Sequence, residues 1–487
     1  MSIVLIGLAA CETKKPENPG TEQKATSHYH KWADPKLDTL ADLSIEALRN
    51  RAYGSTIKIE SRLDSAEDET GYSQFFSADG SSTYNTYMAS YQSDGNRVYS
   101  RMDIPSSPPS EDGYPVMVFV HGWVGQQDAP SFDFNYKADS LYSRYIDAFV
   151  DAGYLVLTPG WRGHGVVNGI HAEGFEFMEA WDNGSYLSPI FYAIDVLNLI
   201  EGIQTIEHID WENWGAKETE TPRVNHRKIH VTGHSQGGDS ALTVMAVSGE
   251  NSTLKNTVYS GSLWSGCFGT RFAQAGIYGP MATTLEAFMS GDGSWTGSAE
   301  GRDESINPNF VFAWPPDWIG TLDTNSPDWS WQADNWKLKA VAESLDIKFS
   351  EMYNAINENV EDINDASFKI EQDINGKTIV RHDPRIIEAM HRISAYNYEQ
   401  YLTEPLLFHH SDQDYYSIPE WNAELSARIN SSGGNSHDFT YLGNTHSLLI
   451  SKHEWFSKKD AREGFEIMIS HDLNLLDIGD AELTPTP

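Results

Sequence analysis

The sequence predicts an α/β fold, in which a mostly parallel central sheet carries helices on both faces and receives a large inserted cap. Three observations predict it. Short, continuous apolar runs have the composition of strands that are buried on both faces. Each run ends in a turn of glycine and polar residues, and the spacing leaves room for helices between the runs. One run leads into Gly-x-Ser-x-Gly, which forms a sharp turn between a strand and a helix.

That pentapeptide, Gly-His-Ser-Gln-Gly, occupies residues 233–237 and follows the β-branched segment 228–232. Its two glycines are expected because the turn packs strand and helix too closely for a Cβ at either position. The next segment, 239–247, is rich in Ala, Leu, Val and Met and is predicted to be the helix. The turn would expose Ser235, which is therefore the candidate nucleophile.

A serine hydroxyl needs a histidine to accept its proton and a carboxylate to orient that histidine. With this type of turn, the chain order is serine, then acid, then histidine, each after a strand. Asp412 and Asp414 follow the apolar strand run 405–410, and His446 follows the short run 439–442. His446 is the candidate general base. Position alone leaves both aspartates open as the acid, since an aspartate after a strand also caps turns.

The run 114–120 predicts a buried strand that ends in the tripeptide 121–123, His-Gly-Trp. In this arrangement, the oxyanion of the reaction is bound by two backbone N–H groups, one after the nucleophile and one in the loop after an early strand. The candidate donors are Gln236 and Trp123. The next strand run and its glycine-rich loop, residues 153–165, end at the same edge of the sheet. That loop is expected either to line the pocket or to form only a tight turn.

These residues resemble the catalytic domain of the prolyl oligopeptidase family of α/β-hydrolases. The resemblance lies in the Gly-His-Ser-x-Gly-Gly motif at 233–238 and in the acid loop His-Ser-Asp-Gln-Asp-Tyr with the Ile-Pro-Glu that follows, within 410–420. It lies also in the Gly-x-x-His loop at 443–446 and in the strand pair within 90–105.

The resemblance implies an α/β-hydrolase fold. In the family's acid loop the catalytic acid corresponds to Asp414 rather than Asp412, and the family's general base corresponds to His446. The resemblance covers roughly residues 85–270 and 390–470 and concerns fold and triad rather than substrate.

The resemblance further implies a serine hydrolase that forms an acyl-enzyme on Ser235. Oligopeptidases of the family carry a β-propeller ahead of the catalytic domain, whereas only residues 1–110 precede it here. An ester, of a carbohydrate or an aromatic acyl group, is therefore preferred as substrate. The alternative is an exported serine peptidase acting on short peptides, and a non-catalytic surface-binding protein on the same fold is the third hypothesis.

Residues 3–11, Ile-Val-Leu-Ile-Gly-Leu-Ala-Ala-Cys, resemble the end of a bacterial lipoprotein signal peptide, with Cys11 as the lipidation site. The protein is thus expected to be exported and lipid-anchored in the cell envelope, in the periplasm or at the outer membrane. The predicted organisation is a signal peptide (1–11), a flexible tether (12–35), an N-terminal extension with β-strands (36–110), a hydrolase core (111–274 and 391–475) and an inserted cap (275–390).

The cap combines an irregular stretch with helical apolar spacing over 335–365. Its tryptophans have two interpretations, a platform for a sugar or aromatic group and, preferred, a substitute for a core in a loop-rich segment. They are Trp295, Trp314, Trp318, Trp329, Trp331 and Trp336.

Composition limits the partners. The formal net charge of the 487-residue chain is −36, which argues against nucleic acid because phosphates would not be neutralised. The expected partner is a small-molecule or short-peptide substrate, with membrane contact only through the lipid anchor. Cys11 and Cys267 are the only cysteines, so no internal disulfide is expected if Cys11 is lipidated. No motif for a metal or another cofactor occurs, and none is predicted.

Overall fold

The computed structural model describes most of the predicted core. The described residues are 34–63, 84–134, 140–182, 185–214, 221–256, 258–269, 271, 274, 294–295, 341–372, 378–411, 417, 419–450 and 462–477. Cys11 and five of the six cap tryptophans lie outside them; Trp295 lies in β10. Within the described part, no helix is long and apolar enough to cross a membrane.

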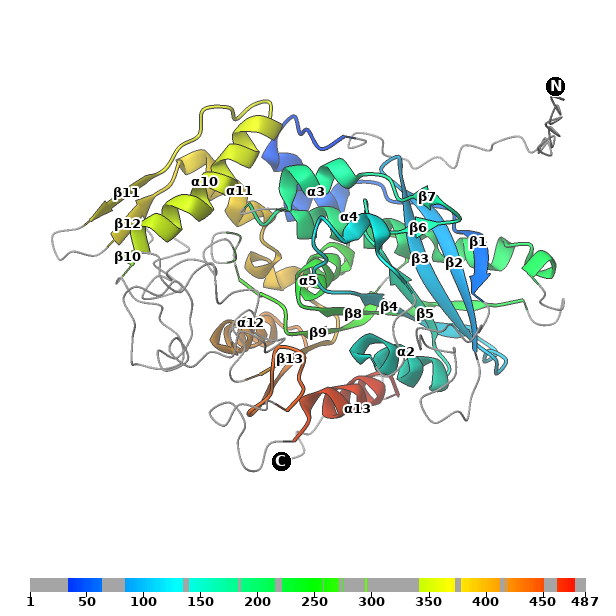
Figure 1. The fold of residues 1–487 in the computed structure, drawn as a ribbon. Helices are drawn as coiled ribbons and strands as arrows, with labels where there is room; N and C mark the ends of the chain where they lie inside the picture. The colour runs from blue at the N-terminus through cyan, green and yellow to red at the C-terminus, as the bar shows by residue number, and fades with distance from the viewer. Residues whose placement is uncertain are drawn as a thin grey trace, which may run out of the picture.

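A nine-stranded mixed sheet forms the centre of the molecule (Figure 1), with the order β1-β2-β3-β5-β4-β8-β9-β13-β14. The first three strands are antiparallel, and the strands from β5 to β14 run parallel to one another. The bounds are β1 Lys58–Leu63, β2 Tyr84–Ser93, β3 Asn96–Pro105, β4 Tyr114–Val120, β5 Leu155–Pro159, β8 Val224–His234, β9 Val258–Trp264, β13 Leu406–Ser411 and β14 Ser436–Tyr441.

Helices cover both faces of the sheet. In Figure 1, α2 and α13 lie together on one face, whereas α4 and α5 lie on the opposite face. The helices are α1 Ile45–Asn50, α2 Leu141–Asp151, α3 Phe175–Trp181, α4 Ser188–Gly202, α5 Gln236–Ser248, α10 Val341–Asn359, α11 Pro384–Ile393, α12 Pro419–Ser431 and α13 Gly464–Asp477. Short 3₁₀ helices occupy Leu40–Leu43 (η1), Ala129–Ser131 (η2), Ile203–His208 (η3), Trp211–Trp214 (η4), Ala395–Asn397 (η6) and Glu399–Tyr401 (η7).

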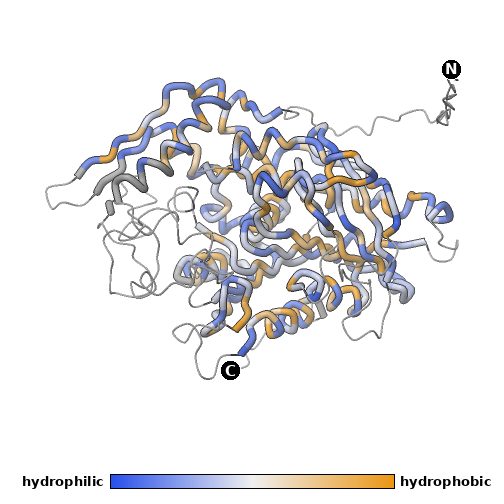
Figure 2. The backbone as a smooth tube through the Cα atoms, viewed as in Figure 1, coloured by the Kyte–Doolittle hydropathy of each residue, from blue (hydrophilic) through white to orange (hydrophobic). Residues whose placement is uncertain are grey.

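The continuous apolar run of β4 follows from this layering. Val116, Val118 and Val120 belong to the core cluster that includes α4 and α5, whereas Met117 and Phe119 belong to the cluster that includes α2 and α13. Because successive side chains point to opposite faces, a strand covered on both sides must be apolar throughout. Figure 2 shows the hydrophobic stretches concentrated in the central strands and the helices that cover them.

The predicted fold class is confirmed by the sheet and its two helical layers. β4 has β5 on one side and β8 on the other, so the chain reverses its direction of travel across the sheet at β4. Ligands of open α/β sheets bind beyond the carboxyl ends of the strands at such a switch point. The candidate oxyanion loop follows β4 and the candidate nucleophile follows β8, so both lie at this position.

The segments predicted as extension and cap contact one another. β1, β2 and β3 are continuous with the main sheet, although they fall in the predicted extension. Leu37, in the extension, pairs with Val360, just after α10, and α11 packs against α1 and η1. The remaining short strands are β6 Val166–Val167, β7 Ile170–His171, β10 Ser294–Trp295, β11 Lys369–Gln372 and β12 Thr378–Arg381.

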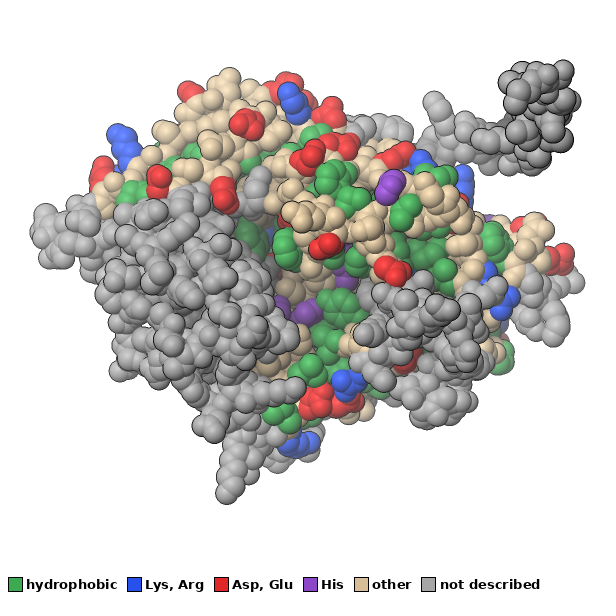
Figure 3. Space-filling view, in the orientation of Figure 1, with side chains coloured by type: hydrophobic (Ala, Val, Ile, Leu, Met, Phe, Trp, Pro, Cys, Tyr) green, Lys and Arg blue, Asp and Glu red, His purple; other side chains and the backbone are tan. Residues whose placement is uncertain are grey.

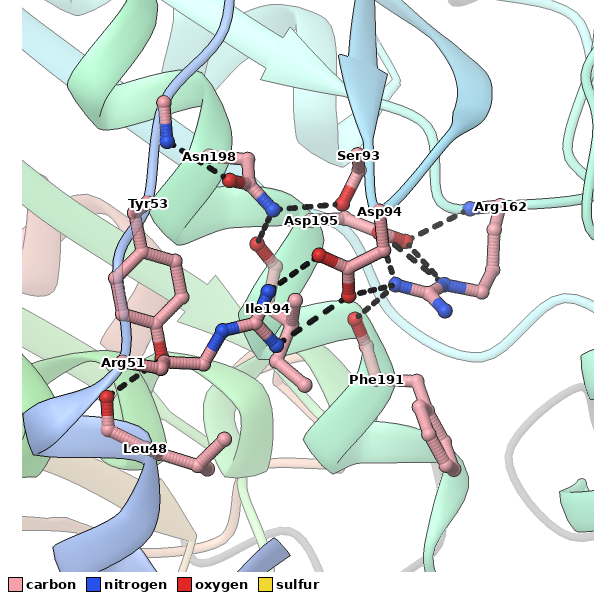
Figure 4. Close-up of polar contacts among 11 residues, drawn as sticks. Leu48, Arg51, Tyr53, Ser93, Asp94, Arg162, Phe191, Ile194, Asp195 and Asn198 are labelled. Atoms are coloured by element: carbon pink, nitrogen blue, oxygen red, sulfur yellow. Dashed lines mark hydrogen bonds and ion pairs between the residues drawn. The ribbon is translucent and has the colours of Figure 1, made fainter. Parts of the chain in front are cut away.

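A buried ion network joins four distant parts of the chain (Figure 4). Asp94, in the turn between β2 and β3, pairs with Arg51, which follows α1. Arg162, in the loop after β5, pairs with Asp195 of α4 at 2.6 Å and lies 3.8 Å from Asp94. At most 5% of any of these four side chains is exposed. Two positive and two negative groups balance, so the cluster carries no net formal charge.

Candidate active site

The predicted strand-to-helix turn is present. β8 ends at His234, α5 begins at Gln236, and the half-buried Ser235 between them has φ 56° and ψ −125°. A positive φ is strained for a residue with a side chain, at a cost of order 1–3 kcal/mol. The turn is held because the Ser235 N–H donates to the Trp264 carbonyl at 3.0 Å and its carbonyl accepts from Gly238.

Both glycines of the turn are required, as the sequence predicts. A Cβ on Gly233 would lie 2.3 Å from the carbonyl oxygen of Gly237. A Cβ on Gly237 would lie 2.2 Å from the carbonyl oxygen of Val120, at the end of β4. The second clash involves the neighbouring strand, so this close approach also brings the loop after β4 near the candidate nucleophile.

That loop passes close to Ser235. A Cβ on Gly122 would lie 3.3 Å from the Ser235 Cβ. The Gly122 N–H donates to the Tyr142 hydroxyl at 2.9 Å, so it is already occupied. Among the described residues, no acceptor takes the N–H of Trp123 or of Gln236. Gln236 directly follows Ser235 and Trp123 directly follows Gly122, so these two amides are the candidate oxyanion donors.

His446 lies in the loop after β14 and is half-buried. Its ring centroid is 5.1 Å from that of His234, the residue directly before the nucleophile. The candidate base and the candidate nucleophile, which are remote in sequence, therefore lie in one neighbourhood. Figure 3 shows histidine and hydrophobic side chains in a hollow in the middle of this face of the molecule.

The acid loop begins beside the His446 loop. In the parallel register of β13 and β14, Ser411 lies opposite Tyr441, so the two strands end side by side. The Ser411 hydroxyl also donates to the carbonyl oxygen of Asn444. Asp412 and Asp414 lie outside the described residues, so the choice of Asp414 as acid stays a prediction.

Tyr142, on α2, is a site residue that no motif indicates. Because its hydroxyl accepts from the Gly122 N–H, it donates its own proton to His234 Nδ1 at 2.7 Å. The other nitrogen, Nε2, then carries a proton and faces the His446 carbonyl oxygen at 3.4 Å. Burial lowers the pKa of His234 well below its usual value, in agreement with this neutral ring. A hydrogen-bond relay thus joins the oxyanion loop to the loop of the candidate base.

Tyr142→Phe is expected to lower kcat for a model ester by about fivefold, because losing a hydrogen bond costs about 1 kcal/mol and 1.36 kcal/mol is tenfold in rate. The change leaves the Gly122 N–H without its acceptor and His234 Nδ1 without its donor. Steady-state kinetics with p-nitrophenyl acetate measures the effect. Tyr259→Phe, which removes a hydroxyl from β9, is the control, and equal rates for the two variants would contradict the role of the relay.

The oxyanion loop rests on stacked rings. Tyr192, Trp161 and His121 stack at centroid distances of 4.1 Å each, and Phe132 lies 4.6 Å beyond His121. Burial lowers the pKa of His121 to about 3, so its ring is neutral at neutral pH. Its Nδ1 lies 2.7 Å from the Gly122 carbonyl oxygen and donates to it. His121 therefore has a local structural role.

The glycine-rich loop after β5 is buried throughout residues 160–165. Trp161 supports the stack below the oxyanion loop and Arg162 belongs to the buried ion network. His164 Nδ1 bonds locally to the carbonyl of Arg162 at 3.0 Å. Of the two interpretations of this loop, the structure therefore supports the tight turn over a pocket lining. No cluster of three or more metal-binding side chains occurs among the described residues.

Comparisons with known proteins concern the fold alone. No protein-family model and no curated protein sequence matches the chain. Similar solved structures include a putative dipeptidyl aminopeptidase IV from Bacteroides ovatus (12% identity, TM-score 0.43). They also include an acylaminoacyl peptidase from Pyrococcus horikoshii (14%, 0.42) and acetyl xylan esterase 1 from a Thermoanaerobacterium species (11%, 0.42). The matches cover 81%, 84% and 92% of this chain, and 36%, 44% and 97% of those chains, respectively.

Proposed function

We propose that this protein is a serine hydrolase that cleaves a carboxylic ester through an acyl-enzyme on Ser235. One observation carries the proposal: a strained turn holds Ser235 close to the loop after β4 and to the loop of His446, and no acceptor among the described residues takes two amide N–H groups of this region. The amides belong to Trp123 and Gln236. A half-buried serine with a positive φ is strained, and such strain gathers at functional sites.

The arrangement can perform acyl transfer in two steps. The Ser235 oxygen attacks the ester carbonyl while His446 accepts the hydroxyl proton, and the new oxyanion accepts hydrogen bonds from the amides of Trp123 and Gln236. His446 then returns the proton to the leaving alkoxide as the carbon–oxygen bond breaks. Water, deprotonated by His446, hydrolyses the acyl-enzyme, and the serine recovers its proton. Asp414 is the group we expect to orient His446.

Two observations support an ester rather than a peptide. Trp123, which follows Gly122 in the candidate oxyanion loop, is 60% exposed, and an aromatic face of this kind suits a sugar ring or an aromatic acyl group. A peptidase that binds the amino terminus of a peptide needs, near the serine, a carboxylate that is not already engaged by other side chains. Asp182 lies near Trp123, but its oxygens already accept hydrogen bonds from three side chains.

The test is a panel of p-nitrophenyl esters, acetylated and feruloylated sugars, and aminoacyl-p-nitroanilides with the purified protein. We expect ester turnover and labelling by a fluorophosphonate probe, both lost in Ser235→Ala and retained in Ser431→Ala, which alters an exposed serine of α12. Anilides that turn over far faster than every ester would instead establish the peptidase. Absence of both turnover and labelling in the unmodified protein would reject the enzyme.

We also propose that the enzyme acts outside the cytoplasm, anchored through Cys11. This proposal is supported by the pattern of residues 3–11 and by the acidic composition alone.

A further inference from the structure

Asp182 directly follows α3, and its backbone N–H donates to the carbonyl oxygen of Met178 in the last turn of that helix. Its Oδ2 accepts from the indole Nε1–H of Trp123 at 2.9 Å. Its Oδ1 accepts from the Ser188 hydroxyl at 3.0 Å and from the Gln236 side-chain amide at 3.3 Å. One carboxylate thus binds side chains from the loop after β4, from the start of α4 and from the start of α5.

Two of those side chains belong to the residues that carry the candidate oxyanion amides. Trp123 and Gln236 come from elements far apart in the sequence, and the distance between their N–H groups determines whether both can reach one oxyanion. Oxyanion donors act at 2.7–3.1 Å, so a small error in that distance weakens the effect. Asp182 holds the two residues by their side chains, and no acceptor in the described part of the chain takes their backbone N–H groups.

A second contact fixes the same loop to the same helix end. The side-chain amide of Gln126 donates to the carbonyl of Met178 at 3.1 Å and to that of Asp182 at 3.4 Å. The loop after β4 is therefore tied to the end of α3 at two points. All three side chains around the carboxylate act as donors, and their hydrogen bonds lower the pKa of Asp182. Burial has the larger effect and raises this pKa above its usual value.

We propose that Asp182 is a positioning residue that sets the oxyanion site by clamping Trp123 to Gln236. This inference rests on the proposed function. Asp182 does not touch the reacting atoms; it acts through the two donors. Its removal should therefore weaken transition-state binding and leave substrate binding nearly unchanged, so the loss falls on kcat rather than on KM.

Asp182→Asn is the sharpest variant because it preserves shape. An amide has one acceptor oxygen, so either Trp123 or Gln236 must face an N–H₂ group, donor against donor. Loss of one oxyanion donor costs about 10²–10³ in kcat, and a displaced pair should cost roughly 10- to 100-fold. Trp123→Phe removes the indole N–H and keeps an aromatic ring, so it should lower kcat in the same direction without disturbing the core.

The experiment measures kcat and KM for p-nitrophenyl acetate with the full chain, the two single variants and the double variant. We expect the combined loss to be smaller than the product of the single losses, since both changes break the same hydrogen bond. Glu173→Gln, which removes an exposed carboxylate just before α3, is the matched control and should behave like the unmodified protein.

Asp182→Asn and Trp123→Phe variants that both keep kcat within twofold of the control would overturn the proposal. A loss confined to KM, seen for aminoacyl substrates and not for p-nitrophenyl acetate, would also overturn it and make Asp182 a substrate-binding group. If the asparagine variant does not fold by circular dichroism, the Trp123→Phe result decides alone. These outcomes are separate from failure of the proposed function, in which the unmodified protein neither hydrolyses esters nor labels with the probe.

Discussion

His446→Ala is expected to lower kcat for an ester substrate by roughly 10⁴- to 10⁶-fold, the range found when one member of a serine triad is removed. The reason is that the other histidine at the turn, His234, is a poor acceptor for the Ser235 proton. His234 lies closer in sequence, but its Nδ1 is occupied by Tyr142 and burial lowers its pKa well below the usual value. A buried, neutral ring with a depressed pKa is a poor proton acceptor.

The measurement is ester hydrolysis together with the rate of fluorophosphonate labelling of Ser235, because both need the activated hydroxyl. His208→Ala, at the exposed end of η3, is the matched control among the chain's 17 histidines. Added imidazole should restore part of the lost rate by entering the space that the side chain leaves. Full activity and labelling in His446→Ala would show that another residue is the base, and would remove the mechanism proposed above.

The sequence predicts those parts of the site that are determined by residues close together in the chain. Strand β4 matches its apolar run over 114–120, since a strand covered on both faces must be apolar at every position. Helix α5 begins at Gln236, whereas the sequence places the helix from 239. The start of the helix is not predicted because residues 237 and 238 are glycines, and glycine is a poor helix former. These glycines are explained by close packing.

Strand β14 shows the same limit at the edge of the sheet. It spans Ser436–Tyr441, and the sequence pattern indicates only its last residues because the strand begins with Ser436, His437 and Asp438. An edge strand has a neighbour on one side only and tolerates polar residues that a central strand excludes. The candidate base still follows the strand as predicted, because the end of the run determines its position.

Contacts between distant elements are not readable from one sequence. Tyr142 and Asp182 belong to no motif, and their hydrogen bonds form only when α2 and α3 pack beside the turn. A tyrosine on an amphipathic helix, or an aspartate at a helix end, occurs in many proteins for local reasons. Only the folded chain brings the donors from three separate elements around the half-buried carboxylate of Asp182. Arg162 is a further example, because the sequence alone allows its loop to be either a pocket lining or a tight turn.

Asp195→Ala is expected to cost roughly 3–5 kcal/mol in the free energy of unfolding, the usual effect of removing one partner of a buried ion pair. Asp195 accepts from the Arg162 backbone N–H at 2.9 Å and from its guanidinium at 2.6 Å and 3.1 Å. The nearest other carboxylate, Asp94, lies 3.8 Å away and is already paired with Arg51. The variant would leave an uncompensated buried positive charge.

Urea unfolding monitored by tryptophan fluorescence measures the change, with Asp112→Ala as the control for an exposed aspartate. A second variant separates charge from packing. Arg162→Met together with Asp195→Leu removes both charges and should recover much of the loss, because apolar replacement of a buried pair is often neutral. If Asp195→Ala unfolds at the same urea concentration as the control, the network does not stabilise the fold.

Asp195→Ala should also lower the catalytic rate under conditions in which the protein is still folded. Arg162 follows Trp161 directly, and Trp161 stacks on His121, which holds the Gly122 carbonyl of the oxyanion loop. A displaced Arg162 therefore loosens the base of that loop while Ser235 stays in its turn. In the folded variant, kcat for an ester should fall. A fluorophosphonate probe should still label Ser235 in every molecule. An unchanged kcat with lower stability would limit the network to the fold and separate it from the site.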